Sequence, residues 1–323
     1  MKLATTINYM NQEMEQIESL MHEIVNAEEQ TISETSSYLL DAGGKRIRPI
    51  FVLLAAQFGA GKNDRILNVA VTLEMIHMAS LVHDDVIDNA DTRRGQATVN
   101  YKWDNSTAMY TGDYLFARTI ELLNGPNEVA LHQVLSNTIY QVCIGEISQI
   151  RDKYDLNQRK IEYFKRIRRK TALLISTSTQ LGAIAAETSD QTVKHLKRYG
   201  YYIGMSYQII DDILDFTSDE KTLGKPVGSD LRSGNLTLPT ILALEEDETI
   251  KDKVSSFFEN PDETEVNLTQ LIEDIKHSKA IEASFQCSQS YLRKALKELE
   301  YLPDIRAKRS LQKIAAYLGK RKF

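Results

Sequence analysis

The chain is poor in the residues that interrupt regular structure. Its 323 residues include only 15 glycines and 6 prolines. A chain of this length built from many short strands and turns would need more of both, so a helical fold is expected. Two cysteines, Cys143 and Cys287, are too few for a disulfide framework and favour a reducing compartment.

Long apolar runs and an amino-terminal signal are also lacking. No apolar stretch reaches the roughly 18–20 residues that a membrane-spanning helix needs. The start of the chain has no apolar core of the kind that signal peptides carry. We therefore expect a cytoplasmic protein with at most peripheral membrane contact.

Positive charge is in deficit, because 39 Lys and Arg face 45 Asp and Glu and the net charge is −6. This balance argues against a nucleic-acid-binding protein, which normally presents a basic face. Apolar residues at 42% and charged residues at 26% are typical of a folded globular chain and exclude a disordered one. An anionic ligand would have to be held by a local concentration of cations.

Helical periodicity covers most of the sequence. In 67–88 apolar residues occupy nearly the whole helix circumference, which predicts a buried, central helix. No repeat and no Pro/Ser-rich linker divides the chain, so we predict one all-α domain over residues 1–323. Further helical patterns occupy 105–123, 127–150, 159–187, 191–216, 263–276, 279–299 and 304–318.

Three loops combine glycine with charged residues: 41–49, 89–100 and 217–236. Glycine lets a backbone approach an anion closely, and cations attract it. Taken singly, each loop is more often a plain surface turn than a phosphate site.

The sharpest feature is a motif that occurs twice, DDVID at 84–88 and DDILD at 211–215, each at the end of an apolar helical run. Positions i and i+4 share a helix face, so Asp84 projects with Asp88 and Asp211 with Asp215. Like charges at that spacing destabilise a helix by a few tenths of a kcal/mol, which a bound cation would offset. One such cluster is as well explained by a solvated helix end, but two matching ones favour Mg²⁺, which accepts carboxylate and phosphate oxygens.

The motifs in chain order resemble the signature regions of the all-trans polyprenyl diphosphate synthases over roughly residues 40–240. After Gly234 many members of that family carry Lys where this chain has Asn235, so no extra diphosphate contact is expected there. The carboxyl end, GKRKF at 319–323, is similar to that of the medium-chain bacterial members. The segments that carry the resemblance are GGKRIRP (43–49), LVHDDVIDNADTRRG (81–95), GDYLFA (112–117), GEISQ (145–149), RKTALL (169–174), YQIIDDILDF (207–216) and GKPVGSDLRSGNLTLP (224–239).

The resemblance implies a single large helical bundle around a central cavity, with the two aspartate motifs facing each other across it. It implies Mg²⁺-dependent, head-to-tail condensation of isopentenyl diphosphate onto an allylic diphosphate such as farnesyl diphosphate. The product would be a medium-chain polyprenyl diphosphate for quinone side chains, heptaprenyl (C35) or, as an alternative, hexaprenyl. Three Mg²⁺ ions are expected with substrate bound. The implied metal ligands are Asp84, Asp88, Asp211 and Asp215. The implied catalytic residues are Asp84, Asp85, Asp88, Asp211, Asp212 and Lys170.

The resemblance also assigns the two diphosphates. His77 lies seven residues before Asp84, which places both on one helix face, although a histidine on an apolar helix is usually a hydrogen-bonded core residue. Single cations such as Lys170 and Arg93 are more often solvated than functional. The implied ligands are Lys45, Arg48, His77 and Arg94 for isopentenyl diphosphate, and Arg93, Lys170, Thr171, Gln208 and Lys225 for the allylic diphosphate.

Small residues before the first motif indicate a long product. Ala79 and Ser80 stand one turn before Asp84, where relatives with short products tend to carry aromatic residues, and Ile76 stands two turns before it. We expect these three residues to govern chain length, the alternative being that Ala79 only lets helices approach closely.

Two other functions remain open. A terpene cyclase is also all-α and carries a DDxxD motif, but it usually pairs it with a different metal motif. A non-catalytic partner subunit would be expected to lose aspartates, and both motifs are intact here. The resemblance to two-component medium-chain enzymes implies a smaller regulatory subunit, with a homodimer as the alternative.

Overall fold

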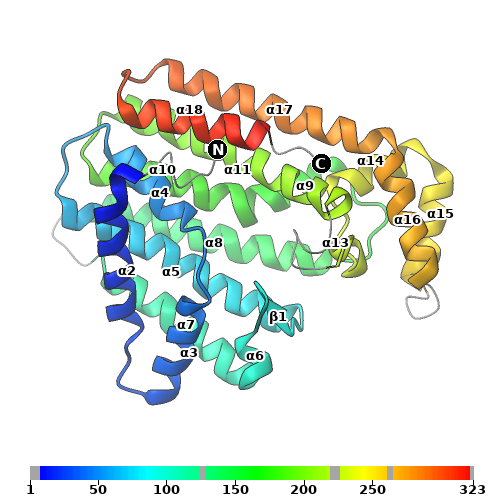
Figure 1. Ribbon diagram of the computed structural model, residues 1–323, viewed down its shortest axis with the longest axis horizontal. Helices are drawn as coiled ribbons and strands as arrows, with labels where there is room; N and C mark the ends of the chain where they lie inside the picture. The colour runs from blue at the N-terminus through cyan, green and yellow to red at the C-terminus, as the bar shows by residue number, and fades with distance from the viewer. Residues whose placement is uncertain (1–7, 124–127, 219–225, 260–264, 321–323) are drawn as a thin grey trace. The chain divides into compact units, whose positions relative to one another are not determined.

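The computed structural model describes residues 8–123, 128–218, 226–259 and 265–320 (Figure 1). Within these ranges all regular secondary structure is helical apart from one antiparallel hairpin, β1 (Thr92–Arg93) with β2 (Gln96–Ala97). The predicted all-α fold is therefore confirmed.

The chain forms two compact units. Unit 1 comprises Met1–Asn137, Leu174–Gly200 and Glu298–Ile314, and unit 2 comprises Thr138–Leu173, Tyr201–Lys297 and Ala315–Phe323. Several helices contribute residues to both units, namely α8 (Val129–Arg151), α10 (Leu173–Ala185), α11 (Asp190–Thr217), α17 (Lys279–Glu300) and α18 (Arg306–Gly319). One domain over the whole chain stays a prediction.

Unit 1 is built around one long apolar helix, α5 (Asn63–Ile87), which packs against several other helices of the unit. It is the one described helix that is long and apolar enough to cross a membrane, yet 72% of its most apolar window is buried in the structure, as in the core helix of a globular protein. This is the central helix that the sequence predicts. The remaining elements of unit 1 are a 3-10 turn, η1 (Asn8–Met10), and the helices α2 (Asn11–Val25), α3 (Gln30–Asp41), α4 (Ile47–Ala56), α6 (Val99–Lys102) and α7 (Asn105–Glu121).

Unit 2 has a large apolar core to which Tyr163, Ile209, Ile213 and Phe216 belong. α14, α15 and α16 contact one another and lie side by side at the right of Figure 1. The helices that lie wholly in unit 2 are α9 (Lys160–Ile167), the π-helical turn η2 (Arg168–Ala172), α13 (Ser229–Arg232), α14 (Leu238–Glu246), α15 (Glu248–Glu259) and α16 (Glu265–His277). Pro239 lies in the first turn of α14 after Thr237, as its position in the sequence predicts.

The structure departs from the sequence prediction at two kinds of place. The segment 159–187, predicted as one helix, is interrupted by the π turn η2. The loops predicted at 89–100 and 217–236 contain the β1–β2 hairpin and the short helix α13. Elements of two to four residues are too short for apolar periodicity to reveal them.

Gly182 permits a close approach of α10 to α4. A Cβ atom at this position would lie 2.4 Å from the carbonyl oxygen of Val52 and 2.9 Å from its Cα. We expect Gly182→Ala to lower the free energy of unfolding by about 1–3 kcal/mol, because relieving the clash requires helix displacement. This loss outweighs the gain of about 1 kcal/mol in helix propensity.

Urea denaturation with circular dichroism measures this effect. Gly319→Ala is the matched control, because a Cβ there meets only side-chain atoms at 3.2 Å or beyond. A midpoint for Gly182→Ala equal to or above that of the original protein would contradict the close-packing argument.

Candidate functional site

The first aspartate cluster lies at the carboxyl end of α5, where Asp88 is the C-cap residue. Asp84 and Asp85 are 8% and 2% exposed, whereas Asp88 is exposed. Burial raises the pKa of Asp85, and Arg93 opposes this by donating from Nε to Asp85 Oδ1 over 2.5 Å. The spacing of the motif therefore does place three carboxylates at one helix end, with one of them already paired to a cation.

The hairpin that follows α5 positions two adjacent arginines. Register pairs Arg93 with Gln96, which leaves Arg94 and Gly95 as a two-residue turn with φ of 54° and 78°. Positive φ at both central residues is the pattern of a type I′ hairpin turn, for which glycine is well suited. Arg94 Nη1 donates to the carbonyl oxygen of Gly43, so the turn is held against the glycine-rich loop before α4.

Arginines gather around His77 of α5. The pKa of His77 is well below its usual value, because burial and the charges of Arg48, Arg94, Arg93 and Arg46 disfavour the imidazolium. Three of the four residues predicted for isopentenyl diphosphate, namely His77, Arg48 and Arg94, are therefore brought together within unit 1. The fourth, Lys45, is exposed on the adjacent loop.

A small cavity of about 30 Å³ adjoins this region. Its lining includes Asp85, Arg93 and Arg94 together with Tyr38 and Met78. A carboxylate and two guanidinium groups meet an apolar wall here, but a volume of this size holds only about one or two water molecules and is too small for a diphosphate.

The second aspartate cluster lies near the carboxyl end of α11. Asp211 is exposed, whereas Asp212 is 3% exposed and accepts hydrogen bonds from Tyr163 Oη at 2.6 Å and Gln208 Nε2 at 2.8 Å. Burial, with the nearby charges of Asp230 and Asp211, raises the pKa of Asp212 to about 8 against the effect of both hydrogen bonds. Thr171 Oγ1 donates to Gln208 Oε1 at 2.6 Å. Two residues predicted for the allylic diphosphate thus form one chain of hydrogen bonds with the motif.

Asp215 is fully buried, and both of its carboxylate oxygens accept hydrogen bonds. Oδ1 accepts from Ser229 Oγ at 2.9 Å and Oδ2 from the backbone N–H of Asp230 at 3.2 Å. The side chain thereby satisfies donors at the start of α13. Its predicted role as a metal ligand stays a prediction, while its role in shaping the loop after the motif is evident.

Lys170 lies in the π turn η2, where it pairs with Glu146 Oε2 at 3.0 Å. A Cβ at the neighbouring Gly145 would lie 2.8 Å from Arg169 Cβ, so glycine lets α8 approach the π turn closely. Single π turns occur frequently at functional sites, because they change the direction of a side chain without ending the helix. Lys225 lies outside the described residues.

The three residues predicted to govern chain length lie in the interior part of α5. Ile76 and Ala79 are fully buried, and Ser80 donates from Oγ to the carbonyl oxygen of His77 at 2.9 Å. Their burial suits either a tunnel wall or tight helix packing, so their role stays a prediction.

The sequence analysis does not identify Tyr163, which contacts Asp212, or Arg46, whose charge acts on His77. Tyr163 is separated from Asp212 by 49 residues, and no local pattern distinguishes it from a core tyrosine. Arg46 stands inside the GGKRIRP segment, so a signal existed, but only its neighbours Lys45 and Arg48 were assigned.

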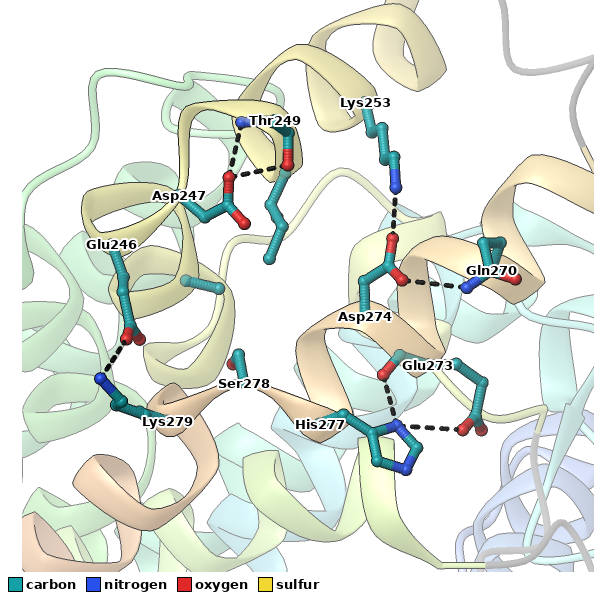
Figure 2. A pocket seen from close by; sticks show the side chains of 12 residues that line it. Glu246, Asp247, Thr249, Lys253, Gln270, Glu273, Asp274, His277, Ser278 and Lys279 are labelled. Atoms are coloured by element: carbon teal, nitrogen blue, oxygen red, sulfur yellow. Dashed lines mark hydrogen bonds and ion pairs between the residues drawn. The ribbon is translucent and has the colours of Figure 1, made fainter.

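A separate groove of about 790 Å³ lies among α14, α15 and α16 (Figure 2). Its charged residues pair with one another, as Lys253 does with Asp274 at 2.5 Å and Lys279 with Glu246 at 3.6 Å. None of the predicted site residues lines it. The groove therefore provides positions for control substitutions.

The donor chemistry of both aspartate clusters fits a hard divalent cation, because carboxylate oxygens are its preferred ligands. Across the described ranges, no three His, Cys, Asp or Glu side chains converge to form a complete protein cage.

Comparisons with known proteins agree with these motifs. Residues 29–275 match the family model described as Polyprenyl synthetase. The chain is 52% identical to Heptaprenyl diphosphate synthase component 2 of Bacillus subtilis, over the whole chain and 92% of that protein. It is 50% identical to the protein of the same name from Geobacillus stearothermophilus, over the full length of both.

Two solved structures are similar in fold. One is heptaprenyl diphosphate synthase from Staphylococcus aureus, with a TM-score of 0.92, 43% identity and coverage of 97% of this chain and 99% of that one. The other is a polyprenyl synthase from Caulobacter crescentus in complex with calcium and isoprenyl diphosphate, with a TM-score of 0.94, 28% identity and coverage of 99% and 98%.

Proposed function

Because this chain belongs to the polyprenyl synthetase family and is a prenyltransferase that elongates trans-prenyl chains, we propose that it makes heptaprenyl diphosphate (C35). It would do so by repeated head-to-tail condensation of isopentenyl diphosphate onto an allylic starter, farnesyl diphosphate. The observation that carries the proposal is full-length identity of about half to two heptaprenyl diphosphate synthase components, with both aspartate motifs intact. Quinone side chains are the proposed use of the product, and the cytoplasm is the proposed location.

We assign Mg²⁺, three ions with substrate bound, as the metal. Asp84, Asp88 and Asp211 would be ligands, and the calcium in one structural relative supports a divalent ion. When bound, the ions stabilise the negative charge that develops on the departing diphosphate. Asp85 and Asp212, both buried, would orient the neighbouring carboxylates.

The chain's own cations would hold the two diphosphates. Arg48, Arg94 and Lys45 present guanidinium and ammonium donors for isopentenyl diphosphate, and guanidinium matches phosphate oxygens in pairs. In the protein without substrate, burial and nearby arginines lower the pKa of His77 and favour its neutral form, which can donate one hydrogen bond. Lys170, Thr171 and Gln208 would hold the allylic diphosphate, together with Arg93 and Lys225.

We also propose that the chain works with a second, smaller component, because the two relatives are named component 2. A homodimer is the alternative assembly. The test is therefore run with and without the other component of the Geobacillus stearothermophilus enzyme.

The experiment supplies farnesyl diphosphate, isopentenyl diphosphate and Mg²⁺ and identifies products by mass spectrometry. We expect C35 heptaprenyl diphosphate as the main product, no product after chelation by EDTA, and restoration by Mg²⁺. A C30 main product would shift the assignment to hexaprenyl. Cyclised hydrocarbons without consumption of isopentenyl diphosphate would indicate a terpene cyclase, and no turnover with the second component present would contradict catalysis.

A further inference from the structure

Arg46 is a buried cation that lies in the sequence between two more exposed cations, Lys45 and Arg48. It is 8% exposed, whereas Lys45 is exposed and Arg48 is intermediate. It is the N-cap residue of α4, with φ of 46° and ψ of 40°. A left-handed conformation is uncommon outside glycine and costs about 1–2 kcal/mol, so surrounding contacts must hold it.

The Arg46 guanidinium group connects the loop to three helices of unit 1. Its Nε and Nη2 donate to the two carboxylate oxygens of Glu18 in α2 at 2.6 and 3.2 Å. Nη2 also donates to the carbonyl oxygen of Leu40 in α3 at 3.3 Å. The planar fork of arginine suits this bidentate pairing, which lysine cannot reproduce.

The third connection is to Glu74 in α5, whose Oε1 lies 3.5 Å from Arg46 Nη1. Glu74 is 3% exposed, and its Oε2 is buried without a hydrogen-bond partner. A buried carboxylate is strongly disfavoured without a counter-charge. Arg46 supplies that counter-charge to Glu74, which stands three residues, or about one helical turn, before His77.

Gly44 brings Arg46 close to the predicted isopentenyl diphosphate ligands. A Cβ on Gly44 would lie 2.8 Å from Arg94 Nη1 and 3.3 Å from Arg46 Nη1, so both guanidinium groups lie against this glycine. Two cations so close together repel each other unless carboxylates balance one of them. The negative charges of Glu18 and Glu74 balance the positive charge of Arg46.

We infer that Arg46 is a positioning residue for isopentenyl diphosphate. Its ion pairs with Glu18 and Glu74 hold the left-handed turn from which Lys45 and Arg48 extend, without contact between Arg46 and the diphosphate. The inference rests on the proposed function, because it takes Lys45, Arg48 and His77 to bind isopentenyl diphosphate.

Steady-state kinetics of Arg46→Gln test it, with isopentenyl diphosphate varied at saturating farnesyl diphosphate and then the reverse. We expect the KM for isopentenyl diphosphate to rise about tenfold or more. The KM for farnesyl diphosphate and kcat should each stay within about threefold, since their ligands lie elsewhere. Arg46→Lys should restore little of the original KM for isopentenyl diphosphate, because lysine cannot form the bidentate ion pair with Glu18. Glu74→Gln should also raise this KM.

Lys279→Gln is the matched control, because it removes an exposed cation that also pairs with a carboxylate. Its KM values should equal those of the original protein. Equal rises in both KM values for Arg46→Gln would show a general structural role and overturn the inference, as would an unchanged KM for isopentenyl diphosphate or full restoration by Arg46→Lys.

Glu18→Gln keeps the inference testable if Arg46→Gln does not fold. Glu18 is 37% exposed, so its ion pair contributes less and a rise of about threefold in the same KM is expected. An unchanged KM in this variant overturns the inference. If the original protein consumes no isopentenyl diphosphate, the proposed function fails. If the original protein turns over but the variants have an unaltered KM for isopentenyl diphosphate, only the positioning role fails.

Discussion

Replacing Asp84 or Asp211 by alanine is expected to lower kcat by about a thousandfold, because each carboxylate would hold a metal that stabilises the departing diphosphate. Such a loss corresponds to about 4 kcal/mol of transition-state stabilisation. The measurement is release of inorganic diphosphate at saturating substrates, with Mg²⁺ varied over a wide range. Higher Mg²⁺ should recover little of the rate.

Folding is a separate readout for these variants. Asp84 is four residues from Asp88, and removing one of two like charges at that spacing relieves repulsion. We therefore expect an unchanged or higher Tm without metal. The increase in Tm that Mg²⁺ and inorganic diphosphate give the original protein should disappear, because the ligand then stabilises the folded state less.

Asp274→Ala is the matched control, since Asp274 lies in the groove among α14, α15 and α16 and pairs with Lys253 (Figure 2). Its activity should be close to that of the original protein. Near-normal turnover in Asp84→Ala or Asp211→Ala would show that the aspartate does not take part in metal binding.

Ala79→Tyr is expected to shorten the main product from C35 to C15–C20. Ala79 is fully buried and stands five residues before Asp84, which is about 7 Å along the helix axis. A tyrosine ring there would occupy the space into which the growing chain extends. Mass spectrometry of the products measures the change, with the rate of isopentenyl diphosphate consumption as a second readout.

The competing explanation is that Ala79 only permits close packing of α5. In that case Ala79→Tyr would overpack the core, lower stability by about 1–3 kcal/mol and leave product length unchanged. Ala79→Ser adds little volume and should change neither property. A shorter product in Ala79→Ser would also contradict a steric block.

The helices were largely predictable, and the reason is visible in particular segments. Helical patterns at 67–88, 105–123 and 191–216 coincide with α5, α7 and α11 to within a few residues, because each has a sustained pattern of apolar residues. The π turn at Arg168–Ala172 was not predictable, since neither glycine nor proline marks it. The β1–β2 hairpin was missed because Arg94, an unusual residue for positive φ, occupies its turn.

The site residues also fall into those that the sequence predicts and those that it does not. Motif positions such as Asp84 and Arg93 follow from a family resemblance that the comparisons confirm. The partners that orient them do not, because pairs such as Tyr163 with Asp212 depend on packing between distant segments. Asp215 shows that a motif residue can also have a structural role that spacing alone does not reveal.

The arginines around His77 bear on how quickly substrate arrives. Burial lowers the pKa of His77 most, and the charges of Arg48, Arg94, Arg93 and Arg46 lower it further, so the local potential is positive although the chain carries a net charge of −6. Such a potential attracts a diphosphate before contact and raises the association rate, while acidic surface elsewhere repels it. Because the Debye length is about 8 Å in physiological salt, this attraction acts only over the last few ångströms of approach. Added salt should therefore slow capture of isopentenyl diphosphate more than its release.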